Sequence, residues 1–127
     1  MEKNVGTREL AYLGDAVFEL MVREKLVAEQ IPFSSLNQIA DKYVNAKAQA
    51  EMYHRIFTKL SGIEQSIIKR GRNLHTATRS KTACVSEYRH ATGLEVLFGY
   101  LYVNGETSRL REVFEMCTFD YRRLMPE

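Results

Sequence analysis

Apolar residues along the chain recur at the spacing of α-helices, and no segment shows the convincing alternation that marks a strand. Near the N-terminus, five apolar residues at steps of three and four predict one stripe along a helix: Leu10, Leu13, Val17, Leu20 and Met21. Thr7 is the expected N-cap of this helix, and the pattern continues to about Ala28. We therefore predict a helix over residues 7–28.

Five further helical segments follow the first. Serine and asparagine residues are expected to cap the next two, at Ser34 or Ser35 and at Asn45. The expected helices run from Ser34 or Ser35 to about Tyr43, from Ala46 to Leu60, from about Ile63 to Lys69 with Gly71 as the stop, from Ser86 to about Val103, and from Thr107 or Ser108 onward. Residues 72–82 lack periodicity and are expected to form a mobile basic loop. The fold class is therefore predicted as all-α, with about six helices in one domain over residues 1–127.

The first helix carries a carboxylate in an unusual place. Ala11, Val22 and Leu26 project on the same side as Asp15, so the helix is apolar on most faces and is expected to be central to the fold. Gly14 lowers helix propensity by roughly 1 kcal/mol relative to alanine, so a close approach by another helix or a ligand is expected there. Asp15 either has a structural role, in a solvated groove or a buried ion pair, or belongs to a functional site.

The helix near residues 86–103 carries a second such carboxylate. Glu95 shares a face with the small residues Ala91, Thr92 and Gly99, which can admit a neighbouring backbone. If the two small faces pack together, Asp15 and Glu95 meet, and each then raises the pKa of the other unless a cation is bound. Carboxylate oxygens and water suit magnesium or manganese. The alternative is that Glu95 pairs with a basic side chain such as Arg89 or Lys47.

Charge is distributed unevenly along the chain. The net charge is +2, but residues 69–90 contain six basic residues and one acid. This asymmetry favours a localised anionic partner, and together with a magnesium site it indicates a nuclease; a solvated basic loop is the alternative. The two cysteines, Cys84 and Cys117, fit no metal or redox motif and are expected to be packed thiols. No secretory signal or membrane span is visible, so a cytoplasmic location is expected.

Two motifs resemble those of a known family. Residues 10–17, L-A-Y-L-G-D-A-V, resemble the ribonuclease III signature L-E-F-L-G-D-A-V, and residues 92–102, T-G-L-E-V-L-F-G-Y-L-Y, resemble its second acidic motif, D-x-x-E-A-L-x-G-A-x-Y. Ala11 and Thr92 stand where the motifs have acids, so Asp15 and Glu95 alone remain of four. The chain also leaves no expected place for a double-stranded-RNA-binding domain. These departures, with residues 43–50 and 69–73, resemble the short branch of the family, Mini-ribonuclease III.

The resemblance implies a homodimeric, magnesium-dependent endonuclease that cuts double-stranded RNA and matures the ends of 23S ribosomal RNA precursors. Asp15 and Glu95 would hold one Mg²⁺ largely through water, with Mn²⁺ as a possible substitute, and Gly14 and Gly99 would allow close packing at the site. The expected contacts to the RNA backbone are Lys47, Arg70, Arg72, Arg79 and Lys81. A ribosomal protein is a possible helper.

Three further expectations concern individual side chains. Phe18 and Val22 are candidates for the dimer seam. Tyr12, Tyr88, Tyr100 and Tyr102 are expected to be half-buried core residues rather than platforms that stack on bases. Glu19 is expected to pair with Arg23 rather than to join the outer shell of a metal ion.

Two other classes of function remain open at this point. One is a non-catalytic helical module that binds RNA or assists ribosome assembly. The other is a helical protein–protein adaptor whose basic loop meets an acidic partner.

Overall fold

The computed structural model of the protein describes residues 4–74 and 85–117. This part of the chain is helical and contains no strand, which confirms the predicted all-α fold of about six helices. The elements are α1 (Thr7–Ala28), α2 (Phe33–Asp41), α3 (Ala46–Ile56), the short 3-10 turn η1 (Phe57–Lys59), α4 (Gly62–Arg72), α5 (Val85–Val103) and α6 (Thr107–Cys117). Among these helices, none is both long enough and apolar enough to span a membrane.

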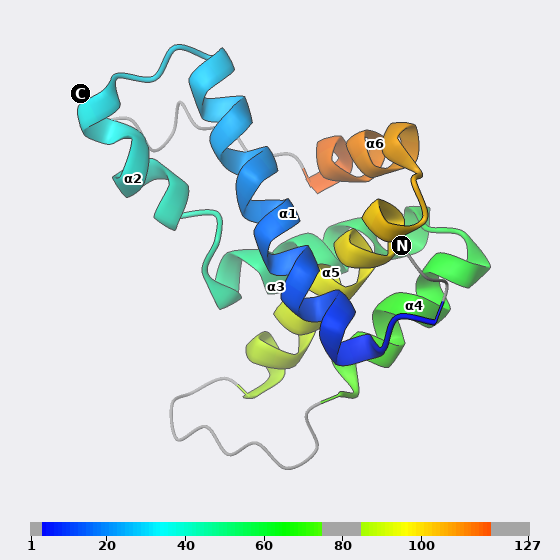
Figure 1. The fold of residues 1–127 in the computed structure, drawn as a ribbon. Helices are drawn as coiled ribbons and strands as arrows, with labels where there is room; N and C mark the ends of the chain where they lie inside the picture. Colours follow the sequence, from blue (N-terminus) through cyan, green and yellow to red (C-terminus); the bar gives the residue numbers. More distant parts are fainter. Residues whose placement is uncertain (1–3, 75–84, 118–127) are drawn as a thin grey trace.

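Helix α5 lies at the centre of the bundle, in contact with α1, α3, α4 and α6 (Figure 1). The sequence predicted this place for the first helix, and that prediction is wrong. The reason is that α5 is apolar around its whole circumference and buries residues 91–94, 96–99 and 101. Helix α1 crosses α5 but keeps one face exposed, and α2 packs mainly on α1.

The contact between α1 and α5 is made by glycines. A Cβ atom added to Gly14 would overlap the carbonyl oxygen of Glu95, and one added to Gly99 would overlap the carbonyl oxygen of Leu10. The two backbones therefore touch at both glycines, closer than any side chain would allow. This crossing fixes the position of Glu95 relative to the residue that follows Gly14, Asp15.

The interior behind this crossing holds an aromatic cluster. The ring of Phe18 on α1 packs edge-to-face on Phe98 of α5, with 5.2 Å between ring centroids, and both approach Phe114 of α6. Phe18 and Val22 have no exposed surface, so their predicted role in a dimer seam is wrong. The buried face of α1 is also rotated relative to the predicted apolar stripe. The face that contains Gly14 turns toward α5, and Leu20 is left 65% exposed.

The helix starts agree with the sequence at Asn45 but not at the first two helices. The side chain of Asn45 accepts a hydrogen bond of 2.8 Å from the backbone N–H of Ala48, as predicted. The prediction is wrong for α1, whose N-cap is Gly6 rather than Thr7, and for α2, whose N-cap is Pro32 rather than a serine. Proline fixes a suitable entry conformation for a helix without a side-chain cap.

The ends of α3 and α4 also differ from the prediction. Helix α3 ends at Ile56, and the chain then tightens into η1 before Ser61. Ser61 and Glu64 form a reciprocal capping box that starts α4. Gly71 was predicted to end this helix but lies inside it. A Cβ atom at this position would overlap the side chain of Val96 on α5. Glycine thus serves close packing of α4 on α5 at this position.

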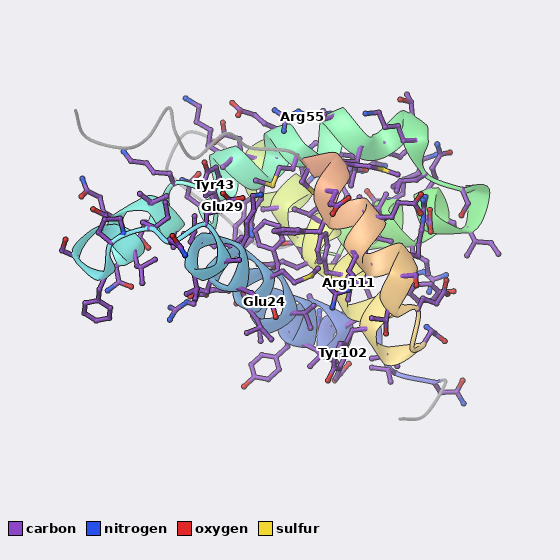
Figure 2. All side chains as sticks on the ribbon, turned by 90° about the horizontal axis from the view of Figure 1, so that it is seen from above. Glu24, Glu29, Tyr43, Arg55, Tyr102 and Arg111 are labelled. Atoms are coloured by element: carbon purple, nitrogen blue, oxygen red, sulfur yellow. The ribbon has the colours of Figure 1, made fainter. Side chains whose placement is uncertain are left out.

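Two arginines connect α6 to its neighbours. The guanidinium of Arg109 donates to both carboxylate oxygens of the buried Glu64, at 2.7 and 2.8 Å, and holds the pKa of that carboxyl below its usual range. Arg55, labelled in Figure 2, donates from α3 to the carbonyl oxygen of Cys117 at the end of α6. Cys117 is a buried free thiol whose burial raises its pKa to about 12, as expected of a packed cysteine; Cys84 lies outside the described residues.

The glycine crossing predicts a large difference between two alanine variants. Gly14→Ala should lower the free energy of unfolding by about 3 kcal/mol, because the added methyl group forces two backbones apart. The matched control is Gly62→Ala at the start of α4, where no atom lies within 4 Å of the added Cβ. The control should be neutral or stabilising by about 0.5 kcal/mol. Urea unfolding followed by circular dichroism measures both, and equal stabilities would contradict the close contact.

Candidate active site

A cavity of about 620 Å³ opens where α1, α3 and α5 meet. Its wall contains both carboxylates that the sequence singled out, Asp15 from α1 and Glu95 from α5. The lining residues are Arg8, Ala11, Tyr12, Asp15, Val44, Ala46, Gln49, Leu74, Tyr88, Ala91, Thr92 and Glu95. The wall is therefore largely apolar, with its acidic groups on the two helices that cross at the glycines.

Asp15 and Glu95 interact directly in this cavity. Burial, followed by the charge of Asp15 and hydrogen bonding with Asp15, together raise the pKa of Glu95 to about 8. Because this pKa lies above 7, the pair holds a proton at neutral pH, which one carboxyl group can share with the other. The alternative partners Arg89 and Lys47 form no ion pair with Glu95 within the described part of the chain.

Local structure explains why these two side chains meet. Gly14 and Gly99 bring the backbones together, and Asp15 directly follows the first of them. On α5, Ala91, Thr92 and Glu95 lie at steps of three and four, so they share one face of the helix. The small side chains on that face leave the space that forms the cavity.

The positions that depart from the ribonuclease III motifs also lie here. Ala11 and Thr92 both line the cavity, and neither brings a carboxylate. The hydroxyl of Thr92 donates a hydrogen bond of 3.0 Å to the carbonyl oxygen of Tyr88. Among the described residues, no third histidine, cysteine, aspartate or glutamate joins the pair to form a cluster of metal ligands.

The chemistry of the two acids fits a hydrated divalent cation. Two carboxyl groups held close together resist carrying two negative charges unless a cation is bound, and Mg²⁺ is commonly held by one or two carboxylates while it keeps several waters. The cavity is large enough for such a hydrated ion together with part of a substrate. Asp15 and Glu95 are the residues that could hold it.

None of the predicted basic residues that the structure describes lines the cavity. Arg70 is exposed in the last turn of α4, whereas Arg72 is half-buried and its Nε donates to Asn73 Oδ1 at 3.2 Å. The chain then reaches Leu74, which is part of the cavity wall. Lys47 is exposed in the first turn of α3, next to the lining residue Ala46. Arg79 and Lys81, and most of the predicted mobile loop, lie outside the described residues.

Several other sequence predictions can be compared with the structure. The tyrosine prediction is wrong for three of the four rings, because Tyr12 is 85% exposed and Tyr88 and Tyr102 are also exposed. The Glu19–Arg23 pair is confirmed, with Arg23 Nε donating to Glu19 Oε2 at 3.1 Å. Sequence reasoning missed Arg8 and Gln49 as lining residues. The sequence does contain an indication for Gln49. It lies three residues after Ala46 and three before Met52, so helical spacing places this polar residue on the otherwise apolar, buried face of α3.

Comparisons with known proteins agree with the motifs. The ribonuclease III domain family matches residues 8–106, which is most of the chain. The chain belongs to the ribonuclease III family of endoribonucleases. It is 47% identical to Mini-ribonuclease 3 of Thermoanaerobacter over 84% of this chain and 76% of that protein, and 39% identical to Mini-ribonuclease 3 of Enterococcus faecalis over 91% and 89%.

A solved structure extends this likeness to the fold. The crystal structure of a Fusobacterium nucleatum protein is 32% identical to the chain, with a TM-score of 0.77 over 90% of this chain and 92% of the other. As a member of the ribonuclease III family, the chain keeps one acid in each of the two acidic motifs, and these are the two acids that meet in the cavity.

The protonated pair predicts an unusual dependence of stability on pH. Glu95 has an ordinary pKa of 4.5 when unfolded and about 8 when folded, so the folded protein binds more protons between these values. In the presence of EDTA, the free energy of unfolding should fall as pH rises through this window, by at most about 1.4 kcal/mol per pH unit.

Glu95→Gln should remove most of this slope, and thermal unfolding between pH 5 and pH 8.5 measures it. Glu19→Gln is the matched control, because Glu19 forms an exposed ion pair outside the cavity. The control should keep the slope of the wild type. A wild-type stability that rises from pH 5 to pH 8 would contradict the assignment.

Proposed function

We propose that the protein hydrolyses phosphodiester bonds of double-stranded RNA in a reaction that depends on Mg²⁺. The observation that carries this proposal is the meeting of Asp15 and Glu95 in one cavity at the crossing of α1 and α5. Membership of the ribonuclease III family supports the reaction class. Mn²⁺ has similar ligand preferences and is the expected substitute.

In this reaction the two acids act as the ligands of the cation. When bound, Mg²⁺ makes a water easier to deprotonate and stabilises negative charge on the phosphate and on the leaving oxygen. Glu95 loses its proton when the cation binds, and Asp15, which is more exposed, is already open to the solvent side of the cavity. The glycine crossing keeps the two carboxylates at a fixed separation without help from a flexible loop.

Basic side chains around the cavity supply contacts to the RNA backbone. Arg70 and Arg72 come from the last turn of α4, shortly before the lining residue Leu74, and Lys47 follows the lining residue Ala46 at the start of α3. We include Arg79 and Lys81 in this surface on the basis of the sequence. Contacts of this type recognise the shape of A-form RNA rather than its bases.

A homodimer would supply a second site for the opposite RNA strand. Three exposed side chains, Tyr12, Leu20 and Val27, lie within one side of α1, and the ring of Phe33 on α2 is 89% exposed. A cavity of about 210 Å³ opens beside them, with Leu26, Val27 and Leu36 in its wall. Exposed apolar surface of this kind favours a protein interface, and a two-fold dimer would bury it on both subunits.

The resemblance to Mini-ribonuclease III suggests the natural substrate. We propose precursors of 23S ribosomal RNA, cut in the cytoplasm by a single domain that spans residues 1–127, with a ribosomal protein as a possible helper. The competing function is a non-catalytic RNA-binding or ribosome-assembly module with the same fold. Retention of both Asp15 and Glu95 in the cavity favours the enzyme.

Replacement of one acid separates these two functions. Asp15→Asn keeps the size of the side chain but removes its charge, so cleavage of long double-stranded RNA in Mg²⁺ should fall by at least about 100-fold. Binding of the same RNA, measured by gel shift in Ca²⁺, should remain within a factor of about three because the basic surface is intact. Undiminished cleavage in this variant would refute the site, and a wild type that binds but never cuts would favour the non-catalytic module.

Replacement of one arginine tests the RNA-binding surface. Arg70→Ala should weaken binding and reduce the slope of log K against log salt by about one, as expected for the loss of one phosphate contact. Arg111→Ala is the matched control, because Arg111 is exposed on α6 and lines a different cavity, between α1 and α6 (Figure 2). Fluorescence anisotropy from 50 to 300 mM salt measures both. Equal slopes for the two variants would remove α4 from the interface.

A further inference from the structure

Gln49 is a buried polar side chain in the wall of the active-site cavity. It is 3% exposed, and it lines the cavity together with Asp15 and Glu95. The other two buried polar residues in the described part of the chain are Glu64, which is paired with Arg109, and Thr92, which donates to Tyr88. Among the described residues no hydrogen bond involves the side chain of Gln49, and its nitrogen and oxygen are not among the fully enclosed polar atoms that lack a partner, so the carboxamide reaches the space of the cavity.

An amide in this situation requires a partner. The carboxamide of Gln49 borders the open cavity, so water in the cavity can hydrogen-bond to it. The neighbouring lining residue on the same face of α3 is Ala46, so the local pattern does not call for a polar group. The partner is therefore sought inside the cavity.

Several groups of the cavity wall can accept a hydrogen bond from water, and Gln49 is the most deeply buried side-chain amide among the described residues. Apart from the two acids, Gln49 is the one lining residue whose side chain has a carbonyl oxygen. The hydroxyl oxygens of Thr92, Tyr12 and Tyr88 can accept as well, whereas the guanidinium of Arg8 can only donate. A cation held by two carboxylates keeps several waters, and each of these waters directs hydrogen atoms outward that need acceptors.

We infer that Gln49 is a positioning residue of the active site, whose carboxamide oxygen accepts a hydrogen bond from a water on the divalent cation held by Asp15 and Glu95. This inference rests on the proposed function, since it presupposes that the two acids hold a cation. Gln49 orients a water ligand in a wall where Ala11 and Thr92 bring no carboxylate. It acts through that water and does not touch the substrate itself.

The test measures metal binding rather than cleavage. Mn²⁺ is added to the full-length, metal-free protein at pH 8.5, and free Mn²⁺ is quantified by electron paramagnetic resonance. Gln49→Leu, which keeps the size of the side chain, should weaken Mn²⁺ binding about ten-fold, in the range typical for the loss of an outer partner of a metal site. Gln49→Glu, which adds a carboxylate, should tighten binding about ten-fold.

The matched control is another glutamine with a purely structural contact. Gln65 on α4 is half-buried, and its Nε2 donates to the carbonyl oxygen of Phe57 at 2.9 Å, outside the cavity. Gln65→Leu should leave Mn²⁺ affinity unchanged while it lowers the melting temperature. Gln49→Leu should show the opposite pattern, with weaker Mn²⁺ binding and an unchanged or higher melting temperature for the metal-free protein.

Each outcome of this experiment decides the inference. Wild-type Mn²⁺ affinity in Gln49→Leu would overturn it, and if that variant does not fold, unchanged affinity in Gln49→Glu would overturn it equally. A loss of melting temperature in Gln49→Leu without a change in affinity would assign Gln49 a structural role. The proposed function fails separately, if wild type and Asp15→Asn bind Mn²⁺ equally, and the inference about Gln49 fails with it.

Discussion

The backbone contact between α1 and α5 is the constraint on which the rest of the structure depends. At Gly14 and Gly99 the two helices touch main chain to main chain, and every other feature of the site follows from that separation. A larger residue at either position would move α1 outward and widen the distance between Asp15 and Glu95. The same crossing turns Phe18, Val22 and Leu26 into the core, which is why α1 buries one face and exposes the other. Packing and site geometry are thus set by the same two residues.

The close approach also creates an electrostatic conflict within the folded protein. Two carboxyl groups are held together partly out of water, and one of them keeps its proton up to about pH 8. Apolar neighbours such as Val44, Ala46 and Ala91 offer this pair no compensation. The contrast with Glu64 is informative, because that carboxylate is more buried yet is satisfied by Arg109 and by the cap at Ser61. A carboxylate pair without such partners is suited to binding a cation that arrives with its water.

Much of the fold follows from the sequence, since helix periodicity is a local property. The number of helices, the cap at Asn45 and the ion pair between Glu19 and Arg23 all depend on residues three or four positions apart. The contact between the two acids joins residues far apart in the sequence, and it was predicted from the small residues near both Asp15 and Glu95, which indicated that the two helices approach closely. Glycine lowers the stability of a helix interior, so a glycine there indicates that another backbone comes close.

The errors arose where tertiary contacts choose between faces that the sequence makes equally apolar. Leu20 and Phe18 are both plausible core residues from periodicity alone, and only the position of α5 decides that Phe18 is buried. The same ambiguity affected Gly71, which as a residue type is a common helix terminator but here packs against Val96.

Gln49 shows the complementary difficulty, because its polar side chain resembles a solvated residue until α1 and α5 enclose it. Once it is enclosed, its carboxamide borders the cavity that contains the two acids and forms no hydrogen bond with a described residue. Its presence is then best explained by the water that a bound cation would bring into the cavity.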